Sequence, residues 1–160
     1  MDLRITARIR LLVADDDASL REALGEFFAR EGYSVQLASS GLEAIDYLRR
    51  RLCDVSVLDG HMPGLTGPQV LRQLLCDAGP AAIPPTLLVS SDASIGTWVH
   101  EQFGPPKFGG SGGLAAGAAN PIGAMGAGSP VGFVPKPFRL VALRHSLEQL
   151  LEGHPPLPPL

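Results

Sequence analysis

Short apolar runs alternate along the chain with stretches whose apolar residues are spaced for one face of a helix. The runs cover residues 9–14, 55–58, 86–89 and 131–134, and residues 33–38 form a further predicted strand in which apolar and polar residues alternate. Each run has the length of a buried strand, and the stretches between them repeat leucine, isoleucine, valine or phenylalanine every three or four positions. This alternation is typical of βαβ units and predicts an α/β fold, a parallel sheet covered by helices on both faces.

Polar residues at the ends of these stretches predict where the helices begin and stop. Ser19 with Glu22, and Ser40 with Glu43, have the spacing of a capping box at a helix N-terminus. Gly32 is placed to end the first helix.

One region interrupts the pattern, because residues 104–130 are rich in glycine, alanine and proline. Each interior glycine disfavours a helix by about 1 kcal/mol relative to alanine, so a long loop is expected there. Only residues 94–103 favour a short helix between the fourth and fifth strands. We therefore expect one domain over residues 9–153, with an N-terminal extension (1–8), the Gly-rich insertion, and a Pro-rich tail (154–160).

Composition narrows the class of protein. The 160 residues, 45% of them hydrophobic, are enough for one domain with one core. A net charge of −3 without a basic stripe argues against a nucleic-acid binder. The N-terminus does not resemble a signal peptide, and no apolar run approaches the roughly 18 residues of a membrane span. A cytoplasmic protein with two reduced, buried thiols, Cys53 and Cys76, is expected.

Polar and charged residues follow four of the five predicted strands. Residues 15–17 are all aspartate, Asp59 ends the third strand, Ser90 ends the fourth, and Lys136 follows the fifth. Binding sites in parallel sheets lie beyond the carboxyl ends of the strands, so we expect these groups to share one crevice. Several carboxylates with one ammonium group suit a divalent cation and a phosphoryl group.

In combination and order, four motifs resemble the receiver domain of bacterial two-component response regulators (the CheY-like superfamily). The motifs are Val13-Ala14-Asp15-Asp16-Asp17, Asp59-Gly60-His61-Met62-Pro63-Gly64 with Gly67, Ser90-Ser91, and Phe133-Val134-Pro135-Lys136-Pro137-Phe138. The resemblance covers the chain from Ile9 to about Glu152, apart from the Gly-rich insertion.

The resemblance implies a doubly wound, flavodoxin-like sheet of five parallel strands in the order 2-1-3-4-5. It also implies that Asp59 accepts a phosphoryl group from a phosphohistidine on a sensor histidine kinase or a histidine phosphotransfer protein. The chain would then act as a phosphorylatable switch of a phosphorelay, not as an enzyme, and would signal to a downstream protein through protein–protein contacts.

A magnesium site is expected where the carboxylates meet. At about 4 Å and an effective dielectric of about 20, each pair of carboxylates repels by roughly 4 kcal/mol, which a hard cation would offset. We expect Asp16 and Asp59 to bind Mg²⁺ directly, Asp15 through water, and His61 through its backbone carbonyl, with its ring exposed in a loop. The alternative for the acidic run is a solvated helix N-terminus, where aspartate is also favourable.

The resemblance implies roles for three further residues. Lys136 would bind phosphoryl oxygens, and its bond to Pro137 is a candidate cis peptide; its alternative is a surface salt bridge. Ser90 would turn its hydroxyl toward the phosphoryl group, whereas the alternative is a bond to a local backbone group. Phe133 matches an aromatic residue that changes rotamer with phosphorylation, and its alternative is an ordinary core residue.

Two other functions compete with the phosphorylatable switch. A phosphorylation-independent pseudo-receiver scaffold would keep only the fold, and the Gly-rich insertion, which departs from the family pattern, keeps that alternative open. An Asp-nucleophile phosphohydrolase would use the same aspartyl phosphate. Such enzymes usually carry a second aspartate two residues after the nucleophile, where this chain has His61.

Overall fold

A computed structural model describes residues 8–104 and 129–155 of the chain. The expected N-terminal extension therefore lies outside the described residues except for Arg8. Most of the expected Gly-rich insertion and the end of the Pro-rich tail lie outside them as well.

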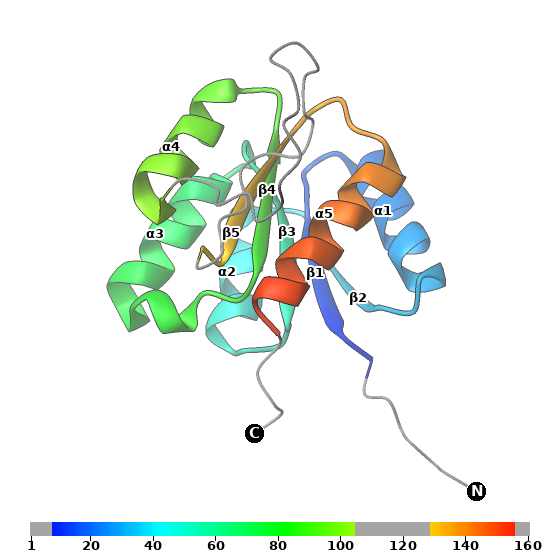
Figure 1. Ribbon diagram of the computed structural model, residues 1–160, viewed down its shortest axis with the longest axis horizontal. Helices are drawn as coiled ribbons and strands as arrows, with labels where there is room; N and C mark the ends of the chain where they lie inside the picture. The colour runs from blue at the N-terminus through cyan, green and yellow to red at the C-terminus, as the bar shows by residue number, and fades with distance from the viewer. Residues whose placement is uncertain (1–7, 105–128, 156–160) are drawn as a thin grey trace, which may run out of the picture.

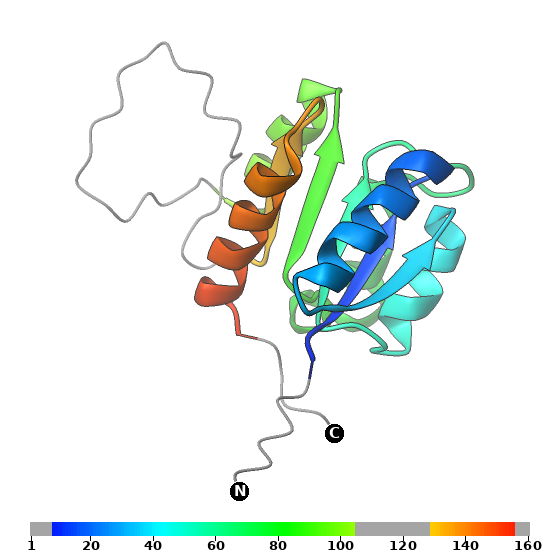
Figure 2. The ribbon, with the colours of Figure 1, turned by 90° about the vertical axis from the view of Figure 1, so that its right-hand side faces the viewer.

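The described residues contain one sheet of five parallel strands in the order β2-β1-β3-β4-β5, as the resemblance implied. The strands are β1 (Arg10–Ala14), β2 (Ser34–Ala38), β3 (Val55–Asp59), β4 (Thr86–Ser90) and β5 (Val131–Pro135). All five run in the same direction (Figure 2), and the register pairs Asp59 with Val89 and Ser90 with Pro135. The residues that follow the strands therefore emerge at one edge of the sheet.

Helices cover both faces of this sheet (Figure 1). The helices are α1 (Ala18–Arg30), α2 (Gly41–Arg49), α3 (Gly67–Ala78), α4 (Ala93–Phe103) and α5 (Leu140–Gly153), with a short 3-10 turn at Pro80–Ala82. The predicted short helix between the fourth and fifth strands is α4. None of these helices, within the described residues, has the length and apolar character needed to cross a membrane.

Two hydrophobic clusters form the core, one on each side of the sheet. Alternate residues of β1 show the division: Leu12 belongs to the cluster that includes residues of α2, α3 and α4, whereas Leu11 and Val13 belong to the cluster that includes residues of α1 and α5. Because the central strands of a parallel sheet are buried on both faces, β1 and β3 appear in the sequence as mostly apolar runs, whereas the edge strand β2 is only partly buried.

The first helix begins differently from the prediction. Asp17 is its N-cap, and the Asp17 carboxylate accepts a hydrogen bond from the backbone N–H of Ser19 at 2.9 Å. The predicted capping box of Ser19 with Glu22 is therefore wrong. The carboxylate directly before the helix binds the free N–H groups of the first turn and replaces Ser19 in that role.

The starts of α2 and α3 follow the expected capping chemistry more closely. Ser40 caps α2 and accepts from the Glu43 N–H at 3.2 Å, but the Glu43 carboxylate bonds the N–H of Ser39, so only half of the predicted box is present. A complete box joins Thr66 and Gln69 at the start of α3.

The two cysteines do not share one environment. Cys53 is buried, and burial followed by the charge of Asp54 raises the pKa of its thiol to about 12. Cys76 is exposed on α3, so the prediction of a second buried thiol is wrong. Both thiols are free.

Candidate functional site

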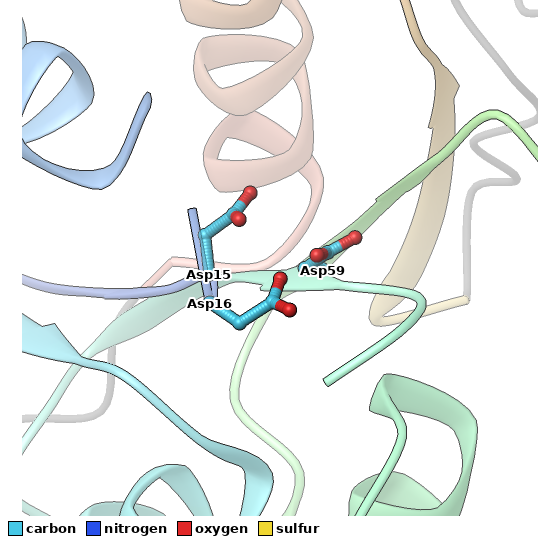
Figure 3. A group of neighbouring side chains, drawn as sticks. All are labelled: Asp15, Asp16 and Asp59. Carbon is cyan, nitrogen blue, oxygen red and sulfur yellow. The ribbon is translucent and has the colours of Figure 1, made fainter. Parts of the chain in front are cut away.

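Three carboxylates meet at the carboxyl ends of β1 and β3. Asp15 and Asp16 follow β1, Asp59 is the last residue of β3, and one carboxylate oxygen from each lies within 4.8 Å of the others (Figure 3). Asp15 and Asp59 are buried, and Asp16 is exposed. The pairing of Ala14 with Leu58 places the residues after β1 beside the end of β3. The predicted convergence of these side chains is confirmed.

Hydrogen bonds to the backbone of Asp15 hold the loop that carries it. The Asp15 N–H donates to the carbonyl of Ala38 at 3.2 Å, and the guanidinium of Arg21 donates to the Asp15 carbonyl at 2.8 Å. The N–H of Asp17 donates to Oδ1 of Asp15 at 2.9 Å. One oxygen of the Asp15 carboxylate is therefore occupied locally, while the other faces the crevice.

Lys136 brings the positive charge into this crevice from β5. Its Nζ lies 3.1 Å from Oδ2 of Asp15 and 3.2 Å from Oδ1 of Asp59. Its backbone N–H donates to the carbonyl of Ser90 at 2.9 Å, and the peptide bond to Pro137 is cis, as predicted. Lys136 thus bridges two buried carboxylates, with its own side chain 25% exposed.

The charges in the crevice are not balanced, because three carboxylates face one ammonium group. Burial and then the charge of Asp15 raise the pKa of Asp59 to about 6, although Lys136 and the His61 N–H oppose the shift. Burial lowers the pKa of Lys136, but its contacts with Asp15 and Asp59 outweigh this effect and raise it. A cluster of oxygen ligands with excess negative charge fits a hard divalent cation.

Ser90 lies buried at the end of β4, beside the residue that follows Asp59. Its Oγ accepts a hydrogen bond from the N–H of Asp92 at 3.1 Å. Oγ also lies 2.8 Å from the position that a Cβ would take on Gly60. In this structure the hydroxyl therefore makes the local backbone contact that the sequence left as an alternative, at a place next to the phosphoacceptor candidate.

Phe133 lies in β5, three residues before Lys136, with its side chain only 8% exposed. Its ring packs against Gly96 of α4 and belongs to the cluster on that side of the sheet. This is the position of a core residue, and any change of rotamer remains a proposal.

His61 lies at the exposed rim of the crevice, as expected. Its ring Nε2 is 3.4 Å from Oδ2 of Asp92, and its backbone N–H points to Oδ1 of Asp59 at 3.4 Å. Asp92 was not among the predicted site residues. A signal for it existed, because an aspartate directly before a helical stretch is a typical N-cap, and Asp92 caps α4.

The sequence model of the response regulator receiver domain family matches residues 11–100. The chain belongs to this family. Over 148 residues it is 34% identical to the response regulator MprA of Mycobacterium sp. (strain KMS) and to that of Mycobacterium tuberculosis (strain ATCC 25618 / H37Rv). Each alignment covers 92% of this chain and 53% of the relative, so the chain spans about half the length of these curated relatives.

Solved receiver structures share the fold. The receiver domain of the Francisella response regulator 1452 aligns with a TM-score of 0.66 and 21% identity, over 91% of this chain and 98% of that one. The chemotaxis response regulator CheY4 of Vibrio cholerae aligns with a TM-score of 0.65 and 19% identity, over 90% and 99%. The family match and the curated relatives place this receiver domain in a class of signalling switches in two-component systems. The family match ends at residue 100, and the fold brings Lys136, which lies beyond it, to 3.2 Å from Asp59.

Proposed function

We propose that this receiver domain accepts a phosphoryl group on Asp59 from a phosphohistidine of a sensor histidine kinase or a histidine phosphotransfer protein. The observation that carries the proposal is the position of the Asp59 carboxylate. It is buried at a strand end, clustered with two other carboxylates, and 3.2 Å from the ammonium group of Lys136. A nucleophile, ligands for a cation and a fixed positive charge are what phosphoryl transfer requires.

In the proposed transfer, an oxygen of the Asp59 carboxylate attacks the phosphorus of the donor phosphohistidine. An O–P bond forms, the P–N bond breaks, and its electron pair stays on the imidazole of the donor. Lys136 is already within hydrogen-bonding distance of Asp59, so its ammonium group is placed to bind a phosphoryl oxygen as negative charge develops there. The Ser90 hydroxyl then donates to another phosphoryl oxygen.

The acidic cluster is proposed to hold Mg²⁺, with Asp16 and Asp59 as direct ligands. Asp15 would act through water, and the backbone carbonyl of His61 would complete the protein ligands. When bound, Mg²⁺ offsets the repulsion among the carboxylates and supplies positive charge for the incoming phosphoryl oxygens. Asp15 keeps one oxygen on the Asp17 N–H and the other on Lys136, which agrees with an indirect role in metal binding.

The output of the switch is proposed to pass through protein–protein contacts to a downstream protein in the cytoplasm. The expectation of no nucleic-acid or membrane contact applies to the residues of this chain. The chain spans about half the length of the matched relatives.

Incubation with Mg²⁺ and acetyl phosphate, followed by intact mass measurement, tests the proposal. We expect the mass of one labile phosphoryl group to be added, and to be absent in Asp59→Asn. Asp46→Asn is the matched control, because Asp46 is an exposed aspartate of α2 outside the crevice, and it should be labelled like the wild type. Trp98 emission gives a second readout of the conformational response.

Two results would contradict the proposal. No labelling in the presence of Mg²⁺ would favour the pseudo-receiver scaffold. Steady turnover of the phosphodonor without an accumulated phosphoprotein would favour a phosphohydrolase.

A further inference from the structure

Arg21 of α1 contacts the loop that carries two of the crevice carboxylates. The residue is half-buried, and its Nη1 donates a hydrogen bond to the backbone carbonyl of Asp15 at 2.8 Å. None of the ion pairs that the described residues form involves Arg21, although three aspartates follow β1. The guanidinium is therefore engaged with a backbone oxygen, and a charged donor makes a stronger hydrogen bond than a neutral one.

The carbonyl that Arg21 binds belongs to the peptide group that joins Asp15 to Asp16. Since a peptide group is planar, a contact that fixes its oxygen also fixes the direction in which the chain continues into Asp16. The next peptide group is held as well, because the N–H of Asp17 donates to Oδ1 of Asp15 at 2.9 Å. Asp16 thus lies between two peptide groups that both have a partner.

Within residues 8–104 and 129–155, no hydrogen bond holds the carboxylate of Asp16 itself. The hydrogen bonds to the crevice carboxylates go to Asp15 and Asp59 instead. Asp16 is exposed, yet its side chain turns toward Asp59, and one of its oxygens lies within 4.8 Å of an oxygen of each other carboxylate (Figure 3). The backbone on either side of Asp16 is therefore what keeps its carboxylate in the cluster.

We propose that Arg21 is a positioning residue for the magnesium site. By holding the peptide group between Asp15 and Asp16, it places the Asp16 carboxylate before the ion binds. The inference rests on the proposed function and deepens it. Without this contact the loop has to be ordered when the ion binds, so the apparent affinity falls in proportion to the fraction of molecules whose loop is already in the binding conformation.

Arg21→Met tests the inference, because charge and position predict effects of opposite sign. Methionine is unbranched and favours a helix, but it has no charge and no N–H to donate. Removal of a positive charge near the crevice would by itself strengthen Mg²⁺ binding, whereas release of the loop weakens it. We expect isothermal titration calorimetry to show binding weakened by about 10-fold, as for other groups that support metal ligands. Arg21→Lys keeps the charge and a donor, and its loss of affinity should be smaller.

Two further measurements separate a loosened loop from a general loss of structure. The Mg²⁺ concentration for half-maximal labelling by acetyl phosphate should rise by the same factor in Arg21→Met, whereas the labelling rate at saturating Mg²⁺ should stay close to that of the wild type. In ¹⁵N NMR without Mg²⁺, the order parameter of the Asp16 N–H should fall from about 0.85, typical of rigid backbone, toward about 0.6.

Arg30→Met is the matched control. Arg30 is the last residue of α1, its side chain is 82% exposed, and it lies 4.0 Å from Glu26. The substitution removes the same charge from the same helix, away from the crevice. It should leave the Mg²⁺ affinity, the labelling and the Asp16 order parameter unchanged.

The two proposals fail in different ways. If wild-type protein neither binds Mg²⁺ nor is labelled, the proposed function is wrong, and the role of Arg21 falls with it. If wild-type protein binds Mg²⁺ and is labelled, but Arg21→Met binds Mg²⁺ equally well or more tightly, only the role of Arg21 is wrong. Equal losses of affinity in Arg21→Met and Arg21→Lys, or in Arg21→Met and Arg30→Met, would also overturn it. If Arg21→Met does not fold, Arg21→Ala is measured in its place with the same expected loss.

Discussion

Two aspartates mark the two ends of β3, and their surroundings differ in charge balance. Asp54 comes directly before the strand and faces Arg10, whose Nε and Nη2 lie 3.1 and 2.7 Å from its carboxylate oxygens. The backbone N–H of Arg10 adds a bond at 2.8 Å. Burial raises the pKa of Asp54, but the bonds to Arg10 outweigh it and the pKa lies below its usual value.

Asp59, five residues further along the same strand, has no partner of its own. It shares Lys136 with Asp15, and Asp16 lies within the same cluster. Its pKa rises to about 6. The matched pair of Arg10 and Asp54 therefore stabilises the fold. The excess of carboxylates around Asp59, in contrast, leaves negative charge that a cationic ligand can neutralise.

Removal of the matched pair should have the largest effect on stability. Asp54→Ala deletes three hydrogen bonds and leaves the Arg10 guanidinium without them, so we expect the free energy of unfolding to fall by about 2–3 kcal/mol. Urea unfolding at pH 7 measures this change. Because the pKa of Asp54 is depressed in the folded state, its contribution is present above about pH 4 and is lost as the pH falls through the lower folded value. A folded Asp54→Ala protein that can no longer be labelled by acetyl phosphate would contradict the comparison.

Asp59→Asn should change stability in the opposite direction. Without Mg²⁺ at pH 7.5, removal of a crowded charge should raise the free energy of unfolding by up to about 3 kcal/mol, since each pKa unit corresponds to about 1.4 kcal/mol. With a raised folded pKa, wild-type protein loses stability as the pH rises from about 4 to about 6. The gain in Asp59→Asn should therefore vanish near pH 4.

Two controls belong to this experiment. Millimolar Mg²⁺ should narrow the difference, because a ligand that binds only the folded wild type stabilises it. Destabilisation by Asp59→Asn at pH 7.5 without metal would show that the crevice is balanced like the Asp54 pair.

The affinity for Mg²⁺ should depend on Asp16 and not on Asp17. We expect Asp16→Asn to weaken Mg²⁺ binding by at least about 10-fold, a factor seen even for groups that only support metal ligands. Isothermal titration calorimetry measures the affinity. Asp17→Asn is the matched control, because the Asp17 carboxylate caps α1 outside the cluster and asparagine is an equally good cap. Equal losses in the two variants would rule out a direct role for Asp16.

The site could be predicted because it depends on features that short segments carry. Buried parallel strands are continuous apolar runs, and the polar residue after each run must emerge at the carboxyl edge of the sheet. The proximity of Asp15, Asp59 and Lys136 could therefore be predicted without knowing the exact register of the strands. Strand order was supplied by the resemblance to receiver domains, since nothing local specifies it.

The features that the sequence did not predict depend on strand register or on which face of a helix a residue occupies. Arg10 and Asp54 are 44 residues apart and meet only because β1 and β3 pair in one register. Cys76 is exposed because of the face of α3 on which it falls. Both Asp17 and Ser19 could cap the N-terminus of α1, and the structure shows Asp17 in that role. The fit of Phe133 against Gly96 depends on the distance between α4 and β5, which no sequence pattern expresses.

An exposed ion pair offers the smallest test of the comparison. Asp46 and Arg50 lie one turn apart on the surface at α2, 3.5 Å from each other, with side chains 67% and 66% exposed. Solvent screening and the entropy of two long side chains limit such pairs, so Asp46→Asn should change the free energy of unfolding by less than about 0.5 kcal/mol. Urea unfolding beside Asp54→Ala, at the same pH and salt, measures the contrast. If Asp46→Asn destabilised the protein as much as Asp54→Ala, loss of an aspartate charge alone would explain both results, and the matched hydrogen bonds to Arg10 would not be what distinguishes the two ends of β3.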